Sequence, residues 1–144
     1  LYAIQTTAST TEGAQYVYCK KLVKNETGER PLYTGYHSTV SAFYYGTLIV
    51  GDQFDGNFDG YSALDTNIPL SSLKEPTAFD SPTTFAVASV IPGWTAALQL
   101  MRAGERWMLY IPWQSAYGSS GNNDGTIPGY TALTFDLLLE RIVE

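Results

Sequence analysis

The feature that most constrains the fold is a single short stretch with the apolar spacing of a helix. In Ser89–Met101 (SVIPGWTAALQLM), four apolar residues from Trp94 to Met101 follow at i, i+3, i+4 and i+7, so they share one helical face. Gly104 stands where such a helix would stop. The Pro-Gly pair places the largest side chain, Trp94, in the first helical turn, an arrangement that a core helix does not need but that suits a helix whose N-terminal end closes the bottom of a pocket.

The segments on either side of this helix are typical of strands. Some are rich in aromatic and β-branched residues, and the last two alternate between apolar and polar residues, which predicts one face turned toward a core. The pattern favours an α+β domain, with an antiparallel sheet and one helix covering a face of it. The predicted strands are Gln15–Val23, Thr39–Leu48, a return strand beginning at Gln53, Thr84–Val90, Arg106–Ile111 and Thr131–Ile142.

Two segments have no sustained period. Residues 1–14 are rich in Thr, Ala and Ser, and we expect a flexible N-terminal tether before a domain that spans residues 15–144. Residues 56–82 contain Gly, Pro, Ser, Asp and Asn throughout, and we expect a long irregular insertion. Three interpretations of this insertion remain open: it covers the rim of a pocket, it binds a partner, or it has no function of its own.

Composition excludes several classes of partner. The 144 residues carry a formal net charge of −6, and only 15% of them are charged. There is no basic stripe, so we expect neither nucleic acid nor an anionic lipid surface as a partner. Because Cys19 is the only cysteine, the chain can form neither an internal disulfide nor a zinc site built from cysteines. We expect Cys19 to be a small buried residue on a strand.

Two motifs, one of catalysis and one of ion binding, are incomplete. The single histidine, His37, is followed by Ser38, but no nucleophile elbow accompanies them, so a catalytic triad is not expected. The stretch from Asp55 to Gly60 (DGNFDG) matches the first half of a calcium loop, but Thr66 stands where the bidentate Glu belongs. We expect turn chemistry there and no metal site.

Several blocks of the chain, in their order and spacing, resemble the FKBP-type peptidyl-prolyl cis-trans isomerases, and most closely the bacterial envelope branch of that family. The resemblance covers residues 16–143 apart from the insertion, and it implies a twisted antiparallel sheet wrapped around one short helix, with a pocket between them. The blocks are YYGTLIVGDQFDG, VIPGW, ALQLMRAGERWMLYIP, SAYG and TALTFDLLLERI.

The resemblance also implies which residues form the pocket. Trp94 matches the pocket floor, and Asp55 matches a carboxylate that hydrogen-bonds to a wall tyrosine. The backbone N–H of Ile91 and the hydroxyl of Tyr117 match two donors to carbonyl groups of the bound peptide. The catalytic residues implied are Tyr44, Phe54, Asp55, Ile91, Trp94, Tyr117 and Phe135, and the further substrate-binding residues are Phe85, Val90 and Ile127.

The chain departs from the family pattern at several positions near this pocket. Many relatives carry Pro in place of Trp113 and Leu in place of Ser115, and Gly129-Tyr130 replaces a Pro-Asn-like pair. The loop after Tyr117 has Asn122 to Asp124 where some relatives have a histidine, so the substrate preference of the chain is open.

The function implied by the resemblance is the acceleration of X-Pro bond rotation in unfolded or partly folded polypeptides, without a cofactor. The alternative is a non-catalytic chaperone or protein-binding module with the same fold. We also expect binding of macrolides of the rapamycin class and a monomer, because no amphipathic dimerisation helix precedes the domain. The expected location is the bacterial cell envelope, in the periplasm or as a tethered lipoprotein.

Overall fold

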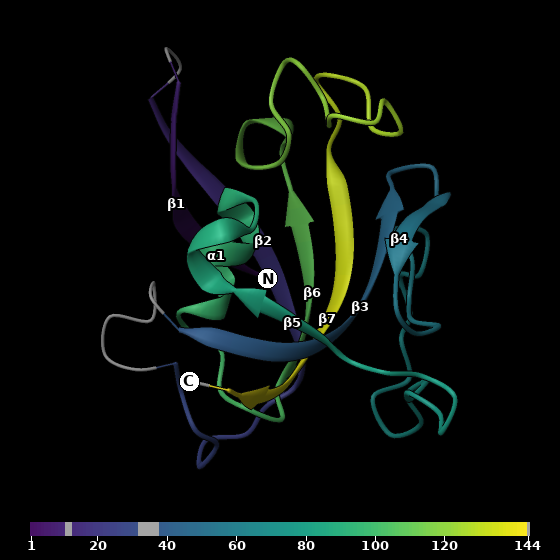
Figure 1. Ribbon diagram of the computed structural model, residues 1–144. Helices are drawn as coiled ribbons and strands as arrows, with labels where there is room; N and C mark the ends of the chain where they lie inside the picture. Colours follow the sequence, from purple (N-terminus) through teal and green to yellow (C-terminus); the bar gives the residue numbers. More distant parts are fainter. Residues whose placement is uncertain (11–12, 32–37, 144) are drawn as a thin grey trace.

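The structure is a computed structural model that describes residues 1–10, 13–31 and 38–143, and Figure 1 shows how its elements are arranged. His37 lies outside the described residues. None of the described helices is long and apolar enough to cross a bilayer. The elements are β1 (Tyr2–Thr10), β2 (Gly13–Val23), β3 (Thr39–Leu48), β4 (Gln53–Gly56), β5 (Thr83–Ala86), the 3-10 helix η1 (Val87–Ser89), α1 (Pro92–Leu98), β6 (Arg106–Ile111), the 3-10 helix η2 (Trp113–Ser115) and β7 (Leu133–Ile142).

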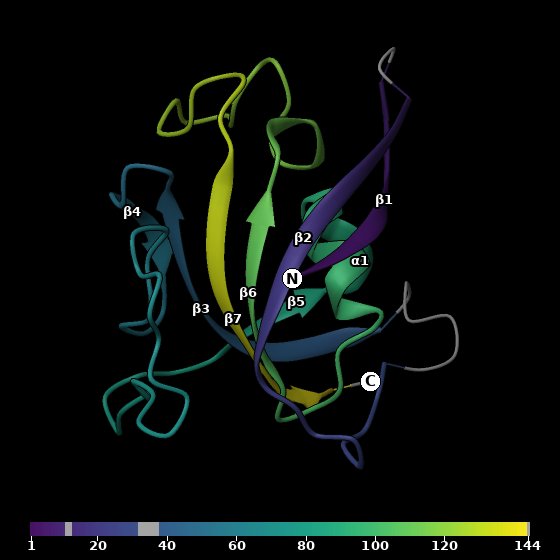
Figure 2. The same cartoon turned by 180° about the vertical axis from the view of Figure 1, so that it is seen from behind.

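The strands form one antiparallel sheet in the order β1-β2-β6-β7-β3-β4, and β5 pairs with β3 beside this path. The sheet twists strongly, and α1 lies against one of its faces (Figures 1 and 2). The predicted α+β class, with a twisted antiparallel sheet around one short helix, is confirmed. Cys19 is fully buried on β2, as expected.

Alternation along β6 and β7 gives the sheet two different faces. Trp107, Leu109, Phe135 and Leu137 belong to the core that packs against α1. Their neighbours in sequence point to the opposite face, as the two-residue period of a strand requires. That opposite face holds a second apolar cluster, made of Leu22, Tyr61, Ile68 and Met108.

The N-terminal segment differs from the flexible tether expected for residues 1–14. Tyr2–Thr10 forms β1, which pairs with β2 in the register Tyr2↔Cys19 and Ile4↔Val17. The hydroxyls of Thr6 and Ser115 are hydrogen-bonded at 2.8 Å, which joins the strand to η2. The strand escaped detection because it is an edge strand whose inner positions include a threonine, so its sequence shows little apolar alternation.

Two further boundaries differ from the predictions. The segment Thr84–Val90 is a strand only as far as Ala86, and η1 follows it. Helix α1 ends at Leu98, although the apolar spacing continues to Met101. Met101 is fully buried, and its N–H still donates to the carbonyl of Ala97 at 3.0 Å, so the apolar pattern reports burial beyond the helix end.

The insertion contains neither helix nor strand from residue 57 to residue 82, in agreement with the prediction. It lies on the side of the sheet away from α1 (Figures 1 and 2). A buried ion pair between Arg106 and Asp136 holds it there, with a closest N···O distance of 2.6 Å. The N–H of Tyr61 donates to Asp136 at 2.9 Å, and Arg106 donates to the carbonyl of Lys74. The insertion is therefore a folded cover on the outer face of the sheet.

Candidate active site

A cavity of about 300 Å³ opens between α1 and the inner face of the sheet. Four strands, the helix and the loop after β6 each contribute to its lining. The lining residues are Tyr44, Phe54, Asp55, Phe85, Ser89, Val90, Ile91, Trp94, Tyr117 and Phe135.

The floor and walls of the cavity are packed aromatic rings. The indole of Trp94 is only 3% exposed, and it meets three rings edge to face. The centroid distances from Trp94 are 5.3 Å to Tyr44, 4.9 Å to Phe85 and 5.2 Å to Phe135. Phe54 meets Phe135 in the same way at 5.5 Å. Because edge-to-face pairs fix ring orientation, the cavity has a rigid apolar lining.

The start of α1 positions the residues at the cavity edge. Ile91 precedes the helix, and its carbonyl accepts from the N–H of Trp94 at 2.9 Å. The hydroxyl of Thr95 donates to the carbonyl of Val87 at 2.7 Å, which ties α1 to η1. A Cβ on Gly93 would lie 2.7 Å from the side chain of Ile111, so this glycine lets the helix approach β6 closely.

The wall on the β3 and β4 side depends on a second close approach. A Cβ on Gly46 would lie 2.7 Å from the ring of Phe135 and 2.8 Å from that of Phe54. Asn57 bonds to the adjacent strand, where its side-chain oxygen accepts from the N–H of Tyr44 at 2.8 Å. Asp55 accepts from the N–H of Gly56 at 2.8 Å. These contacts are the turn chemistry that the DGNFDG stretch predicted.

Two tyrosine hydroxyls and one carboxylate provide the polar groups of the cavity. Burial raises the pKa of Tyr44 strongly, and so do the hydrogen bond from its hydroxyl to Asp55 and the charge of that carboxylate. Burial also raises the pKa of Tyr117, together with the charges of Asp55 and Asp124. Both hydroxyls therefore keep their protons at neutral pH. The hydroxyl of Tyr44 donates to Asp55, and that of Tyr117 is available as a hydrogen-bond donor.

The structure brings together nine of the ten residues predicted for the site, since all but Ile127 line the cavity. Ile127 is 1% exposed and lies in the core, where its N–H and carbonyl bond to Asn122 and close the loop after Tyr117. Its contact with a substrate stays a prediction. Ser89 lines the cavity and was missed, because the strand predicted through residue 90 concealed the turn of η1.

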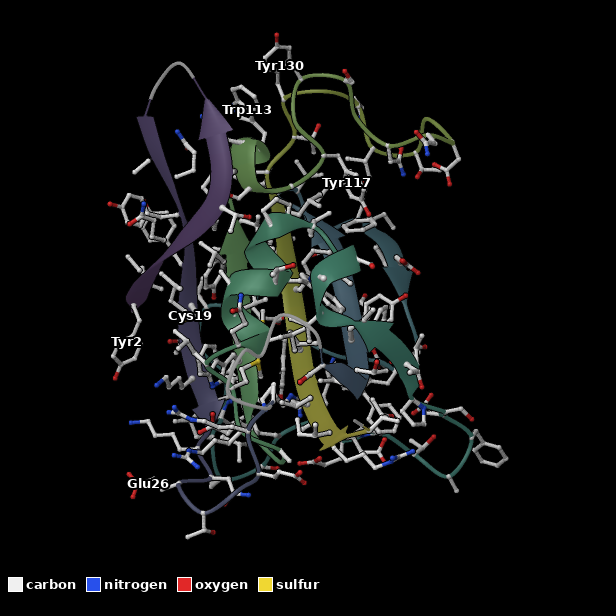
Figure 3. The ribbon with its side chains drawn as sticks, turned by 60° about the vertical axis from the view of Figure 1, so that its left-hand side comes forward. Tyr2, Cys19, Glu26, Trp113, Tyr117 and Tyr130 are labelled. Atoms are coloured by element: carbon white, nitrogen blue, oxygen red, sulfur yellow. The ribbon has the colours of Figure 1, made fainter. Side chains whose placement is uncertain are left out.

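The positions that depart from the family pattern contact other parts of the chain. The rings of Trp113 and Tyr130 meet edge to face with a centroid distance of 4.8 Å, above Tyr117 in Figure 3. Ser115 is fully buried and bonds to Thr6 of β1. Trp113, Ser115 and Tyr130 therefore pack around the cavity and do not line it.

The described residues contain no group of three or more metal-ligating side chains close enough to hold an ion. The fold and the cavity together define an antiparallel sheet packed on the one α-helix of the described residues, with an aromatic cavity between them. The model of the FKBP-type peptidyl-prolyl cis-trans isomerase family matches residues 34–140. The chain belongs to this family, and the resemblance inferred from its sequence is confirmed.

Individual relatives agree with this assignment. The FKBP-type peptidyl-prolyl cis-trans isomerase FkpA of Aeromonas hydrophila is 34% identical over 134 residues, which cover 93% of this chain and 40% of the relative. The outer membrane protein MIP of Legionella longbeachae is 40% identical over 106 residues, covering 74% of this chain and 34% of the relative. A crystal structure of a peptidyl-prolyl cis-trans isomerase from Pseudomonas syringae is similar, with a TM-score of 0.65 and 30% identity, over 89% of this chain and 76% of that one. The chain thus spans well under half the length of these two sequence relatives.

Proposed function

We propose that this domain accelerates cis-trans isomerisation of X-Pro bonds in unfolded or partly folded polypeptides. The observation that carries the proposal is the cavity floored by Trp94, whose aromatic walls fit a prolyl ring and whose rim holds two hydrogen-bond donors. The catalytic roles belong to the proposal as well, with Tyr44, Phe54 and Phe135 as the wall and Asp55 as the acceptor for Tyr44.

The reaction makes and breaks no covalent bond, so catalysis depends on how tightly the twisted amide is bound. The C–N bond of an amide rotates over a barrier of about 18–20 kcal/mol because of its partial double-bond character. A catalyst must bind the twisted amide better than either planar isomer, and each factor of ten in rate requires about 1.4 kcal/mol of such preference. Proton transfer, a nucleophile or a metal is not required for that preference.

Two properties of the cavity supply the preference. An apolar lining removes water from the amide carbonyl, which weakens the charge-separated resonance form of the planar state, and we assign this effect the larger share. Fixed donors hold the peptide on either side of the rotating bond. The hydroxyl of Tyr117 is one such donor, and the N–H of Ile91 is the other, since it bonds to no other described residue.

The cellular setting is part of the same proposal. The similarity to the outer membrane protein MIP of Legionella longbeachae supports a location in the bacterial cell envelope. There the domain would act on proline-containing polypeptides, as a periplasmic protein or as a tethered lipoprotein. The aromatic cavity supports binding of macrolides of the rapamycin class, and we propose that the domain acts as a monomer.

The test is the cis-to-trans rate of short X-Pro peptides with several residues before the proline. We expect the domain to accelerate this rate, a macrolide to block the acceleration and Asp55→Ala to reduce it, since that substitution removes the acceptor of the Tyr44 hydroxyl. These three results together would support catalysis in the aromatic cavity. If the wild type gave only the uncatalysed rate for every peptide while still binding them, the domain would be a non-catalytic binding module. Absence of both rate and binding would contradict the proposal.

A further inference from the structure

We propose that a second cavity, remote from the aromatic one, binds a phosphate group. This basic cavity has a volume of about 400 Å³ and lies where the loop after β2 meets the loop between α1 and β6. It shares no lining residue with the aromatic cavity. In Figure 3 Glu26, which lines it, lies near the lower end of the molecule and Tyr117 near the upper end. The charged residues of its lining are Lys21, Lys24, Glu26, Arg30, Arg102 and Glu105.

The basic cavity concentrates positive charge in an acidic chain. Four of the eight Lys and Arg residues line it, although the formal net charge of the whole chain is −6. None of these four forms a salt bridge with a described acidic residue. Side-chain nitrogens accordingly gather beside Glu26 in Figure 3. Such a local excess of unpaired cations attracts an anion even where the net charge is negative.

The two loops that carry these cations are locked together. Asn25 donates from its side chain to the carbonyl of Ala103 at 2.8 Å, and the N–H of Ala103 donates to the carbonyl of Glu29 at 2.7 Å. The guanidinium of Arg102 donates to the carbonyl of Gly28 at 3.0 Å. The cations therefore stand on a fixed frame, and binding an anion requires little ordering of the backbone.

The two glutamates offset only part of the positive charge of the basic cavity, because its lining has four cations and two carboxylates. Both carboxylate oxygens of Glu105 already accept backbone N–H groups, from Asn25 at 3.0 Å and from Arg102 at 3.0 Å. Glu26 is exposed. Lys21 lies over the rings of Tyr2 and Trp107, at 4.9 and 4.8 Å from their centroids, which holds its ammonium at the cavity.

The donors fit a phosphate better than a single carboxylate. Two guanidinium and two ammonium groups offer more N–H donors than the two oxygens of a carboxylate accept. A phosphate group presents three terminal oxygens and up to two charges, and arginine binds it with paired N–H donors. The volume of the cavity leaves room for a substituent on that phosphate. The ligand class is therefore a phosphate group, carried by a free compound or by a lipid headgroup.

The test compares binding of inorganic phosphate to the intact chain with binding to two matched variants. Arg30 and Arg141 are both exposed, but only Arg30 lines the basic cavity. We expect saturable NMR shifts at the amides of residues 24–30 and 102–105 with sodium phosphate, beyond those of sodium chloride at equal ionic strength. Arg30→Gln should weaken this binding about tenfold, as loss of one charge-assisted hydrogen bond does, while Arg141→Gln should leave it unchanged.

A second experiment, with lipid vesicles, distinguishes a lipid headgroup from a free phosphate compound as the ligand. If the chain cosediments with phosphatidylglycerol vesicles but not with phosphatidylcholine vesicles, and Arg30→Gln abolishes this cosedimentation, the phosphate group belongs to a lipid headgroup. Saturable phosphate binding without cosedimentation assigns a free phosphate compound. Equal shifts in phosphate and chloride, or equal effects of the two arginine variants, would overturn the proposal.

Discussion

The two faces of the sheet use the same strands for opposite purposes. On the inner face, Phe135 of β7 is a wall of an open aromatic cavity. On the outer face, its neighbour Asp136 is fully buried and joins Arg106 in the ion pair that holds the insertion. The inner face forms the aromatic cavity with α1, and the insertion covers part of the outer face.

The two faces of the sheet also differ in whether their buried polar groups have hydrogen-bond partners. The outer face satisfies its buried charges completely, because Asp136 accepts from Arg106 and from the N–H of Tyr61. The inner face keeps donors without partners among the described residues, at the N–H of Ile91 and at the indoles of Trp94 and Trp107. Buried polar groups left unpaired are costly, and two of these three donors belong to residues that line the aromatic cavity.

The largest expected effect comes from breaking the outer face. Asp136→Ala leaves the buried guanidinium of Arg106 without its partner, and we expect a loss of about 3–5 kcal/mol in the free energy of unfolding. Denaturant unfolding measures it. Arg141→Ala is the control, because the pair of Arg141 with Glu140 is exposed and should contribute about 0–1 kcal/mol. Equal losses in the two variants would show that the buried pair does not hold the insertion.

A smaller effect is expected from crowding the inner face. In Gly46→Ala the added methyl group meets the rings of Phe135 and Phe54, so we expect a loss of about 1–3 kcal/mol in stability and a lower isomerase kcat/KM. Gly118→Ala is a control for adding a methyl group near the cavity, because nothing lies within 4 Å of its Cβ position. Its positive φ adds strain but no contact with the wall. An unchanged kcat/KM in Gly46→Ala would show that the packing of the Phe54 and Phe135 rings does not contribute to catalysis.

The hydroxyl of Tyr61 gives a milder way to loosen the outer face. It accepts a hydrogen bond from the N–H of Lys74 at 2.9 Å, within the insertion. Tyr61→Phe should cost about 1 kcal/mol in the free energy of unfolding and should increase amide exchange at Lys74. Unaltered exchange at that amide would mean that this bond does not hold the insertion.

The smallest effect concerns pH. Burial, reinforced by neighbouring carboxylates, raises the pKa of Tyr44 and Tyr117, so the folded state favours their protonated form. Their contribution to stability is complete below the ordinary tyrosine pKa of about 10 and is lost as pH rises from there through the raised values. We therefore expect kcat/KM to be flat from about pH 7 to 9.5. A decline within that interval that disappears in Tyr117→Phe would contradict the assigned donor.

Local patterns predicted the parts of the fold that local physics determines. The spacing from Trp94 to Met101 located the helix, and alternation located β6 and β7. The strand β1 was missed because an edge strand with threonine at an inner position has weak alternation. The pairing of Arg106 with Asp136 was also missed, since it joins two strands and the insertion, and no local pattern contains that geometry.

The candidate site shows the same division. The family resemblance of the aromatic and Pro-Gly blocks implied nine of the lining residues, whereas the turn of η1 that places Ser89 at the cavity left no periodic signal. The basic cavity was invisible in the sequence, because its cations are separated by more than 70 positions between Arg30 and Arg102 and meet only when the two loops are bonded together.

The most direct test of the account is the isomerase kcat/KM of the wild type beside two variants that each remove one tyrosine hydroxyl, Tyr117→Phe on the inner face and Tyr61→Phe on the outer face. We expect Tyr117→Phe to lower kcat/KM about tenfold with stability nearly unchanged, because a donor to the bound peptide is lost. Tyr61→Phe should lower stability and leave kcat/KM unchanged. An active wild type whose kcat/KM fell equally in both variants, or only in Tyr61→Phe, would contradict the assignment of catalysis to the aromatic cavity.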